Sequence, residues 1–206
     1  MQQNQNLPLR ELLEDAWEEV YDLHDLMVIE EDAQDLSLGS IEIKSSSFSG
    51  CSFLDSRFQG TGFDHVTFRN CDLSGCSFDR CGLREVTFLD CRMMGTNFSD
   101  CTLSHCRLEG CQGKYMGLVV CALKHSVMED CNLSGGSLSR CKLDKAKVDR
   151  CDFTRCDFSR AELSGLDFSH CTIEGATWTI DKLKNVTVTT AQAVDLARLI
   201  GLNIVP

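Results

Sequence analysis

The sequence of 206 residues predicts an all-β solenoid, a square coil of short extended segments with a short helix at each end. The placement of two residue types predicts this fold. All eleven Phe residues occupy positions whose numbers end in 3 or 8, and all fourteen Cys residues occupy positions that end in 1 or 6. Neither a helical period of 3.6 residues nor a strand period of 2 produces a period of five.

Two inward-facing classes define the repeat. From Leu38 to Val188 every position ending in 3 or 8, the large class, is apolar except Gly113. From Leu36 to Val186 every position ending in 1 or 6, the small class, is small or apolar except Asp181. Two inward residues followed by three outward ones fit an extended segment and a turn. Four such units close a coil, and stacked coils pair through parallel ladders about 4.8 Å apart. The large class then fills the axis and the small class packs beside it.

The chain divides into three expected parts. Residues 1–35 form an acidic helical cap, residues 36–189 form the repeat coil, and residues 190–206 form a C-terminal helix and strand that serve as a dimer module. Residues 8–27 are predicted to be one amphipathic helix, because their apolar positions follow helical spacing. This helix either covers the open end of the first coil or docks onto a basic partner.

The C-terminal part is predicted to begin at Thr190, the expected N-cap of a helix over residues 191–200 that Gly201 ends. Residues 202–205 are expected to form a short strand, and Asp181 at an inward position predicts a distorted coil before this end. An apolar helix and strand at an open edge suit a cap or a two-fold contact. The residues expected in a dimer contact are Val194, Ala197, Ile200, Leu202 and Ile204.

The distribution of charge along the chain indicates which classes of partner it can bind. The net charge of −11 disfavours direct binding to nucleic acid, and residues 1–35 hold eleven acidic residues against one basic residue. Duplex DNA carries one charge per about 1.7 Å, so a length of about 37 Å carries about 22 negative charges. Residues 36–189 hold 19 acidic and 18 basic residues, so the coil as a whole does not match DNA in charge.

A single face of the coil could still match the negative charge of DNA. Glu109, Glu129 and Asp149 form an outward column at intervals of twenty residues, with Asp90 and Asp130 beside it. These five residues are the candidate partner-binding face. The alternative is a chance alignment on a charged exterior, which Lys147 and Arg150 interrupt.

The cysteines are expected to be small buried fillers with free thiols. Stacked cysteines about 4.8 Å apart suit a disulfide poorly, because its Cβ atoms prefer about 3.8 Å, and one column cannot supply four converging zinc ligands. A thiol-based sensor is the alternative. Free thiols suit the reducing cytoplasm, and no run is apolar enough for a membrane helix, so a cytoplasmic protein without a membrane partner is expected.

No catalytic set, metal or cofactor is expected, because a filled axis leaves no pocket in which reactive groups can converge. His105 and His125 are twenty residues apart and should stack outside the coil. A surface metal site there is the alternative to a solvated stack.

The repeat units resemble those of the pentapeptide-repeat family, which read A-(D/N)-L-x-x. Examples here are Cys71-Asp72-Leu73-Ser74-Gly75 and Ala161-Glu162-Leu163-Ser164-Gly165. The resemblance covers about three quarters of the chain and implies a right-handed quadrilateral β-helix. Segments 163–168, 188–193 and 199–202 resemble the quinolone-resistance subgroup of this family.

The subgroup resemblance implies a non-enzymatic homodimer, joined through its C-terminus. It implies binding to DNA gyrase or topoisomerase IV, both bacterial type II topoisomerases, and protection from quinolones by imitation of DNA. Two features depart from the subgroup. No insertion provides the projecting loops that some members need, and the N-terminal helix is acidic. The alternative is a structural or scaffold repeat protein with another protein partner, which the near-neutral coil favours.

Overall fold

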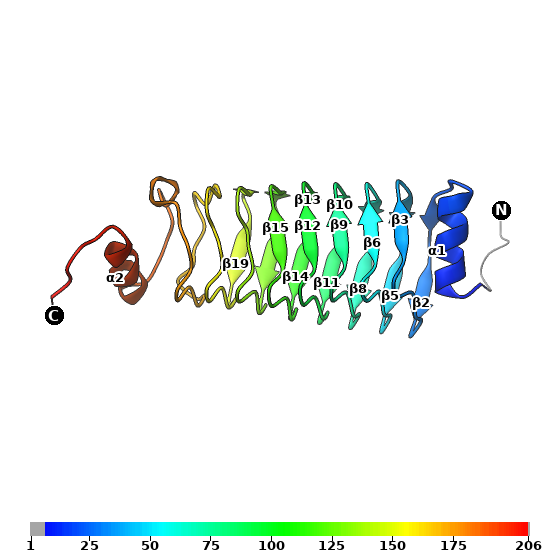
Figure 1. Cartoon of the computed structure of the whole chain (residues 1–206), viewed down its shortest axis with the longest axis horizontal. Helices are drawn as coiled ribbons and strands as arrows, with labels where there is room; N and C mark the ends of the chain where they lie inside the picture. The colour runs from blue at the N-terminus through cyan, green and yellow to red at the C-terminus, as the bar shows by residue number, and fades with distance from the viewer. Residues whose placement is uncertain (1–6, 206) are drawn as a thin grey trace.

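A regular series of turns bends the period of five into a square coil. In the computed structural model, which describes residues 7–205, every position ending in 0 or 5 from Val20 to Gly165 has a positive φ. Such a left-handed residue redirects the chain after each extended segment. The result is a right-handed parallel β-solenoid, with helix α1 (Leu9–Glu18) across its N-terminal end and helix α2 (Thr190–Leu199) beyond its C-terminal end (Figure 1).

Three walls of the solenoid are parallel sheets. The first sheet contains β1 (Leu23–His24), β4 (Glu42–Lys44), β7 (Gly62–Asp64), β10 (Gly82–Arg84), β13 (Thr102–Ser104), β16 (Ala122–Lys124) and β18 (Lys142–Asp144). The second contains β2 (Met27–Ile29), β5 (Ser47–Ser49), β8 (Thr67–Arg69), β11 (Thr87–Leu89), β14 (Arg107–Glu109), β17 (Val127–Glu129) and β19 (Lys147–Asp149). The third contains β3 (Ser37–Gly39), β6 (Arg57–Gln59), β9 (Ser77–Asp79), β12 (Asn97–Ser99) and β15 (Gly117–Val119).

Single bridges between successive coils form the fourth wall, from Asp32↔Ser52 to Asp152↔Thr172. In every wall the paired residues are twenty apart in sequence, as in Phe88↔Leu108 of the second sheet. The predicted square coil with twenty residues per turn is therefore confirmed.

Phenyl rings fill much of the axis, as predicted. All eleven Phe side chains are buried. Rings in successive coils stack, with the centroids of Phe78 and Phe98 4.7 Å apart, whereas rings within one coil meet edge to face, as Phe48 and Phe53 do at 5.5 Å. Both arrangements are favourable for aromatic quadrupoles.

The cysteines are buried and free, as expected for fillers. Several thiols also donate a hydrogen bond to the carbonyl oxygen of the residue 23 positions earlier, as Cys76 Sγ does to Phe53 at 2.9 Å. Ser56 and Thr96 stand at equivalent positions and donate to the corresponding carbonyls of Ala33 and Leu73. Cysteine in this solenoid is thus a small side chain with a weak donor, interchangeable in role with Ser and Thr.

The N-terminal end differs from the prediction of one helix over residues 8–27. Helix α1 ends at Glu18, and the solenoid already begins with strands β1 and β2, within the part assigned to the cap. Leu23, Val28 and Ala33 continue the period of five backwards, and this period overrides the helical spacing. Helix α1 buries Leu9 and Leu13 against the first coil, so it covers the end of the core.

The C-terminal end also differs in detail. Thr189, not Thr190, caps helix α2, and its hydroxyl oxygen accepts a hydrogen bond from the Gln192 backbone N–H at 3.2 Å. Residues 202–205 have no strand partner among the described residues, so the predicted terminal strand is wrong. The predicted distortion at Asp181 is confirmed, because Ile180–Lys182 forms a 3₁₀ helix, η1.

Candidate protein-binding surface

The predicted acidic column lies on the outer face of the second sheet. Glu109, Glu129 and Asp149 are the last residues of β14, β17 and β19, and the parallel register pairs Glu109 with Glu129 and Glu129 with Asp149. Because strand side chains alternate between the two sides of a wall, the inward neighbours Leu108, Met128 and Val148 place all three carboxylates outside.

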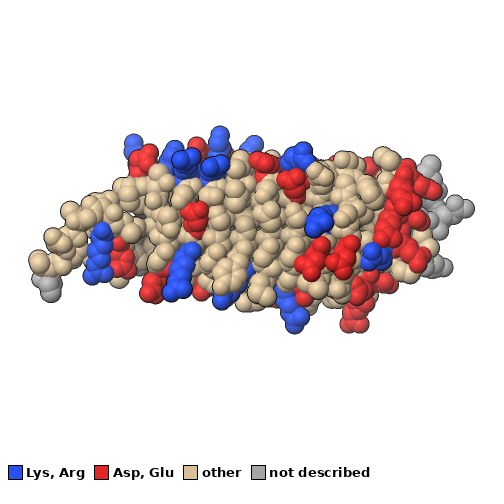
Figure 2. All heavy atoms as spheres, viewed as in Figure 1, with Lys and Arg blue, Asp and Glu red and all other residues tan. Residues whose placement is uncertain are grey.

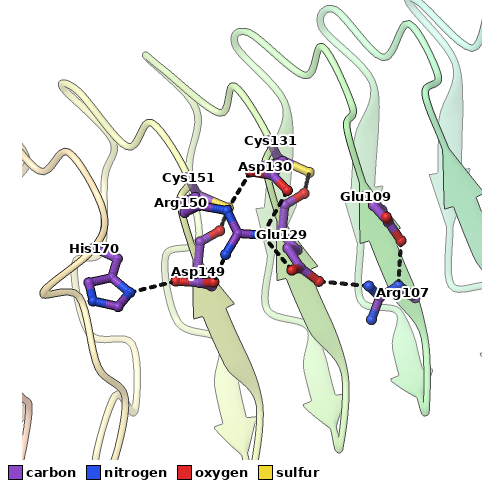
Figure 3. A network of polar contacts seen from close by, with 9 residues as sticks. All are labelled: Arg107, Glu109, Glu129, Asp130, Cys131, Asp149, Arg150, Cys151 and His170. Carbon is purple, nitrogen blue, oxygen red and sulfur yellow. Dashed lines mark hydrogen bonds and ion pairs between the residues drawn. The ribbon is translucent and has the colours of Figure 1, made fainter.

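Two arginines neutralise much of this column (Figure 3). Arg107 Nε donates to Glu109 Oε2 at 2.7 Å and its Nη2 donates to Glu129 Oε2 at 2.6 Å. Arg150 Nη2 donates to Glu129 Oε1 at 2.5 Å, its Nε donates to Asp130 Oδ1 at 2.7 Å, and its Nη1 contacts Asp149. The column is therefore part of a continuous ion-pair network across four coils.

The network ends at His170, whose Nδ1 lies 2.9 Å from Asp149 Oδ1. Hydrogen bonding to Arg150 lowers the pKa of the Asp130 carboxyl, and contact with Glu109 and Glu129 raises the pKa of Arg107. Asp130 and Arg107 therefore stay charged at neutral pH. Four carboxylates thus share this face with two guanidinium groups and the exposed Lys147 of β19, so the face keeps only a small negative charge.

Asp90, the fifth predicted residue, lies at the corner beside this column and forms no ion pair among the described residues. Its carboxylate lies over Gly110, so close that a side chain at position 110 would collide with it. Gly110 also has a φ of +65°, which favours glycine. Asp90 is therefore a free carboxylate at the edge of the face, outside the network.

Sequence reasoning anticipated Arg150 but missed Arg107 and His170. Arg107 could have been found from its spacing, because a residue two positions along a strand lies on the same side, and one 22 positions on lies in the next coil on that side. His170 is 21 positions after Asp149 and therefore also lies one coil further on. The ion pairs themselves depend on side-chain rotamers, which the spacing does not specify.

The strongest acidic surface is at the N-terminal end of the solenoid, where Figure 2 shows Asp and Glu side chains gathered around α1. Glu11, Asp15, Glu18 and Glu19 are exposed on or directly after this helix. Arg10 forms an ion pair with Glu14 at 3.1 Å and leaves these four unpaired among the described residues. A cationic partner would meet the greatest charge density here.

Exposed apolar side chains mark the opposite end. Helix α2 has no buried residue, and Ile200, Leu202 and Ile204, three of the predicted dimer residues, are exposed. The other two, Val194 and Ala197, are half-buried. Met94 and Tyr115 are further exposed apolar residues on the coil, with Lys114 Nζ 5.1 Å from the Tyr115 ring centroid.

The described surface also has an open groove and a stacked pair of histidines. The groove, about 690 Å³, lies beside Trp17, Gly39, Arg57 and Arg80. His105 and His125 stack with centroids 4.9 Å apart and parallel rings, as expected. Within residues 7–205 no three His, Cys, Asp or Glu side chains are placed to hold a metal ion.

No helix in the described part of the chain is long and apolar enough to span a membrane.

Comparison with known proteins agrees with a solenoid built from five-residue units. A family model described as "Pentapeptide repeat region" matches residues 41–118 and 116–178. The chain belongs to the pentapeptide repeat family. A search of curated proteins finds no match.

Solved structures of pentapeptide repeat proteins are similar to this chain. A trypsin-treated form of QnrB1, a plasmid-mediated fluoroquinolone resistance protein, is 19% identical, with coverage of 90% of this chain and 98% of that chain and a TM-score of 0.41. HetL, involved in heterocyst differentiation regulation in the cyanobacterium Nostoc sp. strain PCC 7120, is 17% identical, with coverage of 88% and 94% and a TM-score of 0.36. A protein of the Arabidopsis thaliana thylakoid lumen is 17% identical, with coverage of 62% and 71% and a TM-score of 0.20.

Proposed function

We propose that this protein is a non-enzymatic binding protein that acts through its outer walls, and that its partner is a bacterial type II topoisomerase. The observation that carries the binding role is the filled axis: phenyl, leucyl and thiol groups occupy the interior, so only the walls and ends can contact another molecule. The choice of partner rests on the resemblance of segments 163–168, 188–193 and 199–202 to the quinolone-resistance subgroup. Protection of the enzyme from quinolones is the proposed consequence.

The proposed contact is electrostatic. A topoisomerase that binds DNA presents a cationic surface, and an acidic rod can occupy it without base-specific contacts. Two surfaces of the chain are suitable, the exposed acids around α1 and the face of Asp90, Glu109, Glu129, Asp130 and Asp149. Because Arg107 and Arg150 neutralise part of the second surface, we expect α1 to contribute to the contact.

The proposed homodimer joins two C-terminal ends. Exposed apolar residues of α2 and the following segment support it, since Ile200 is 54% exposed and Leu202 is 53% exposed. A two-fold contact would bury the same patch on both protomers and cover the open end of each core. Two rods joined in this way would form one extended surface for the enzyme.

The test is a gyrase supercoiling assay with purified protein, with and without a fluoroquinolone. Inhibition of supercoiling at micromolar protein, or restored supercoiling in the presence of the drug, would support the proposal. Absence of both effects would reject a topoisomerase partner and favour the alternative of a scaffold protein with another partner. The ion-paired state of the acidic column is the specific observation that favours this alternative.

Charge changes on the acidic face give a sharper prediction. Reversal of Glu109, Glu129 and Asp149 to Lys should weaken the effect on gyrase about tenfold, because like charges then oppose the enzyme. Removal of the counter-charges with Arg107→Gln and Arg150→Gln should instead strengthen it. The control reverses Asp55, Glu162 and Glu174 to Lys, three exposed acidic residues outside this face. It changes the net charge by the same amount as the reversal of the acidic face. If all three variants behave alike, this face does not bind the enzyme.

A further inference from the structure

The first sheet carries an ordered arrangement of charge along the solenoid. Its parallel register aligns two outward columns, one from the first residue of each strand and one from the third. The first column reads Glu42, Gly62, Gly82, Thr102, Ala122 and Lys142. The second reads Lys44, Asp64, Arg84, Ser104, Lys124 and Asp144.

Charged residues of opposite sign lie at corresponding distances from the middle of each column, except that Arg84 corresponds to Ser104. In the first column Glu42 corresponds to Lys142, the four residues between them are small and uncharged, and the register continues beyond Lys142 to Glu162. In the second column Lys44 corresponds to Asp144 and Asp64 corresponds to Lys124, and the register continues beyond Lys44 to His24 of β1. The middle of the wall is open, because a Cβ added at Gly82 would have no neighbour within 4 Å.

We propose that this wall binds the same wall of a second copy, with the two rods antiparallel. A two-fold axis that runs along the strand direction between Gly82 and Thr102 reverses the order of the coils but keeps each column opposite itself. Glu42 then faces the second copy's Lys142, Lys44 faces Asp144, and Asp64 faces Lys124. Symmetry repeats each of these pairs, so one contact gains six ion pairs.

Some of the charged residues in this contact already have an ion pair within the chain, and others have none. Lys124, Lys142 and Asp144 are exposed, and none of them has an ion pair among the described residues. Their proposed partners, in contrast, have ion pairs within the chain: Lys44 Nζ lies 3.8 Å from Glu42 Oε2 and 3.1 Å from Asp22 Oδ2, and Asp64 contacts Arg84. A second copy would satisfy the free ends and join them to the existing pairs in one network.

The corner residues agree with the same operation. It places Arg80 opposite Asp100 and Glu85 opposite His105, while Gly82 meets Thr102 in the middle. The exceptions are Asp22, which faces Glu162 at the rim, and His65, which faces His125 at a corner. A parallel arrangement of the rods, with the axis along the solenoid, pairs Glu42 with Lys44 and Lys142 with Asp144 but sets Asp64 and Lys124 opposite uncharged residues and brings Arg140 against Lys145. Its columns therefore form four ion pairs instead of six. Charge complementarity therefore selects the antiparallel dimer.

We expect a weak contact that depends on salt, because each exposed ion pair contributes little and is screened. It differs from the proposed C-terminal contact and does not depend on a topoisomerase partner. Glu42 and Lys142 are five coils apart in one chain, about 24 Å at 4.8 Å per coil. A zero-length cross-link between them can therefore form only between two copies, and the proposed arrangement brings the two residues together.

The test is carbodiimide cross-linking of the full-length protein at low salt and high concentration, followed by mass spectrometry. A peptide that joins Glu42 to Lys142 is expected, and it should disappear at high salt. Its absence under conditions where the protein self-associates, or a monomer at every concentration, would overturn the proposal.

A charge swap supplies the second arm. Lys142→Glu should weaken self-association about tenfold in sedimentation velocity, because Glu42 then faces a like charge. Glu42→Lys combined with Lys142→Glu should restore it, which loss of folding could not explain. Arg155→Glu, an equally exposed charge change outside the first sheet, is the matched control and should have no effect. Failure of the double variant to restore association would also overturn the proposal.

Discussion

At the scale of single residues, a large side chain at one inward position compensates for a small one at another. Gly113 is the one residue of the large inward class that is not apolar, and it leaves space on the axis. Met116, buried at a position usually held by Cys, Ser or Thr, fills that space: its Sδ lies 3.4 Å from where a Cβ at Gly113 would be. The flexible thioether compensates for a missing side chain in the same coil.

This exchange predicts strong coupling between the two positions. Gly113→Leu alone should destabilise the fold by about 1–3 kcal/mol through overpacking, because its Cβ would lie 2.9 Å from Leu133 Cδ2. Met116→Cys alone should cost about 2 kcal/mol through a cavity. The double variant restores the usual pattern, so it should be more stable than the sum of the single effects by about 1–3 kcal/mol. Urea unfolding of the four proteins measures this coupling.

A distant pair provides the comparison. Met116→Cys combined with Leu38→Ala involves residues several coils apart, and its effects should add within about 0.5 kcal/mol. Simple additivity at Gly113 and Met116 as well would contradict the compensation described here.

At the scale of elements, the turns carry the least favourable backbone conformations of the coil. Most positions with left-handed φ hold residues other than glycine, and Val120 is a β-branched example with a φ of 61°. Steric contact of Cβ with the backbone disfavours this conformation by about 1–2 kcal/mol, least for Asn, Asp and Gly. The ladder between coils holds it in place, as when the Val120 N–H donates to the Ser139 carbonyl oxygen at 3.1 Å.

Relief of this strain gives a stabilising prediction. Val120→Asn should raise the free energy of unfolding by about 1 kcal/mol, because Asn tolerates the left-handed region and Val120 is 45% exposed. The matched control is Val119→Asn, in strand β15, which should be neutral or destabilising because Asn is a poor strand former. Equal effects at the two positions in thermal unfolding would show that the turn conformation is not the cause.

The terminal elements could be predicted less well than the coil. Phe and Cys mark the period of five between Phe48 and Cys171, whereas the first coil has neither residue type, so the sequence alone predicts a helix at Leu23. Acidic residues around it made that interpretation consistent with an amphipathic pattern. The column of Glu109, Glu129 and Asp149 followed from the period alone, but its neutralisation by Arg107 depends on rotamers.

Substitutions in the C-terminal segment should disrupt the proposed dimer. Ile200→Asp with Leu202→Asp should convert a C-terminally joined dimer into a monomer, because two charges on each protomer would be buried in the contact. Light scattering after size exclusion at high salt measures this contact without the one proposed for the first sheet. Met27→Asp, a change at a more exposed apolar residue near the other end, should leave the dimer intact. A wild-type monomer at high salt would reject the C-terminal contact.

At the scale of the whole molecule, one chain combines a neutral, tightly packed coil with ends of different character. The N-terminal end is covered by α1 and strongly acidic, while the C-terminal end exposes apolar residues. Because neighbouring coils contact mainly each other, the stability of a solenoid is approximately a sum over coils and interfaces. The walls can therefore vary in charge, coil by coil, while the interior stays constant.

The buried thiols give the coil a characteristic response to alkaline pH. Burial raises the pKa of Cys76 and Cys156 to about 12 and that of Cys106 to about 11, from an ordinary value of 9.0. Above pH 9 the unfolded chain releases these protons while the folded chain retains them. The unfolded state then binds fewer protons, so the free energy of unfolding falls as pH rises.

The expected slope from these three thiols is about 4 kcal/mol per pH unit between pH 9.5 and 10.5, since each thiol contributes about 1.4 kcal/mol. Urea unfolding across this range measures it. Changing Cys76, Cys106 and Cys156 to Ser should remove most of that contribution, because Ser56 and Ser126 already show that a hydroxyl fits this class of position and finds a carbonyl acceptor. A stability that stays constant up to pH 10.5, or rapid labelling of the native thiols at neutral pH, would contradict the role of cysteine as a buried filler.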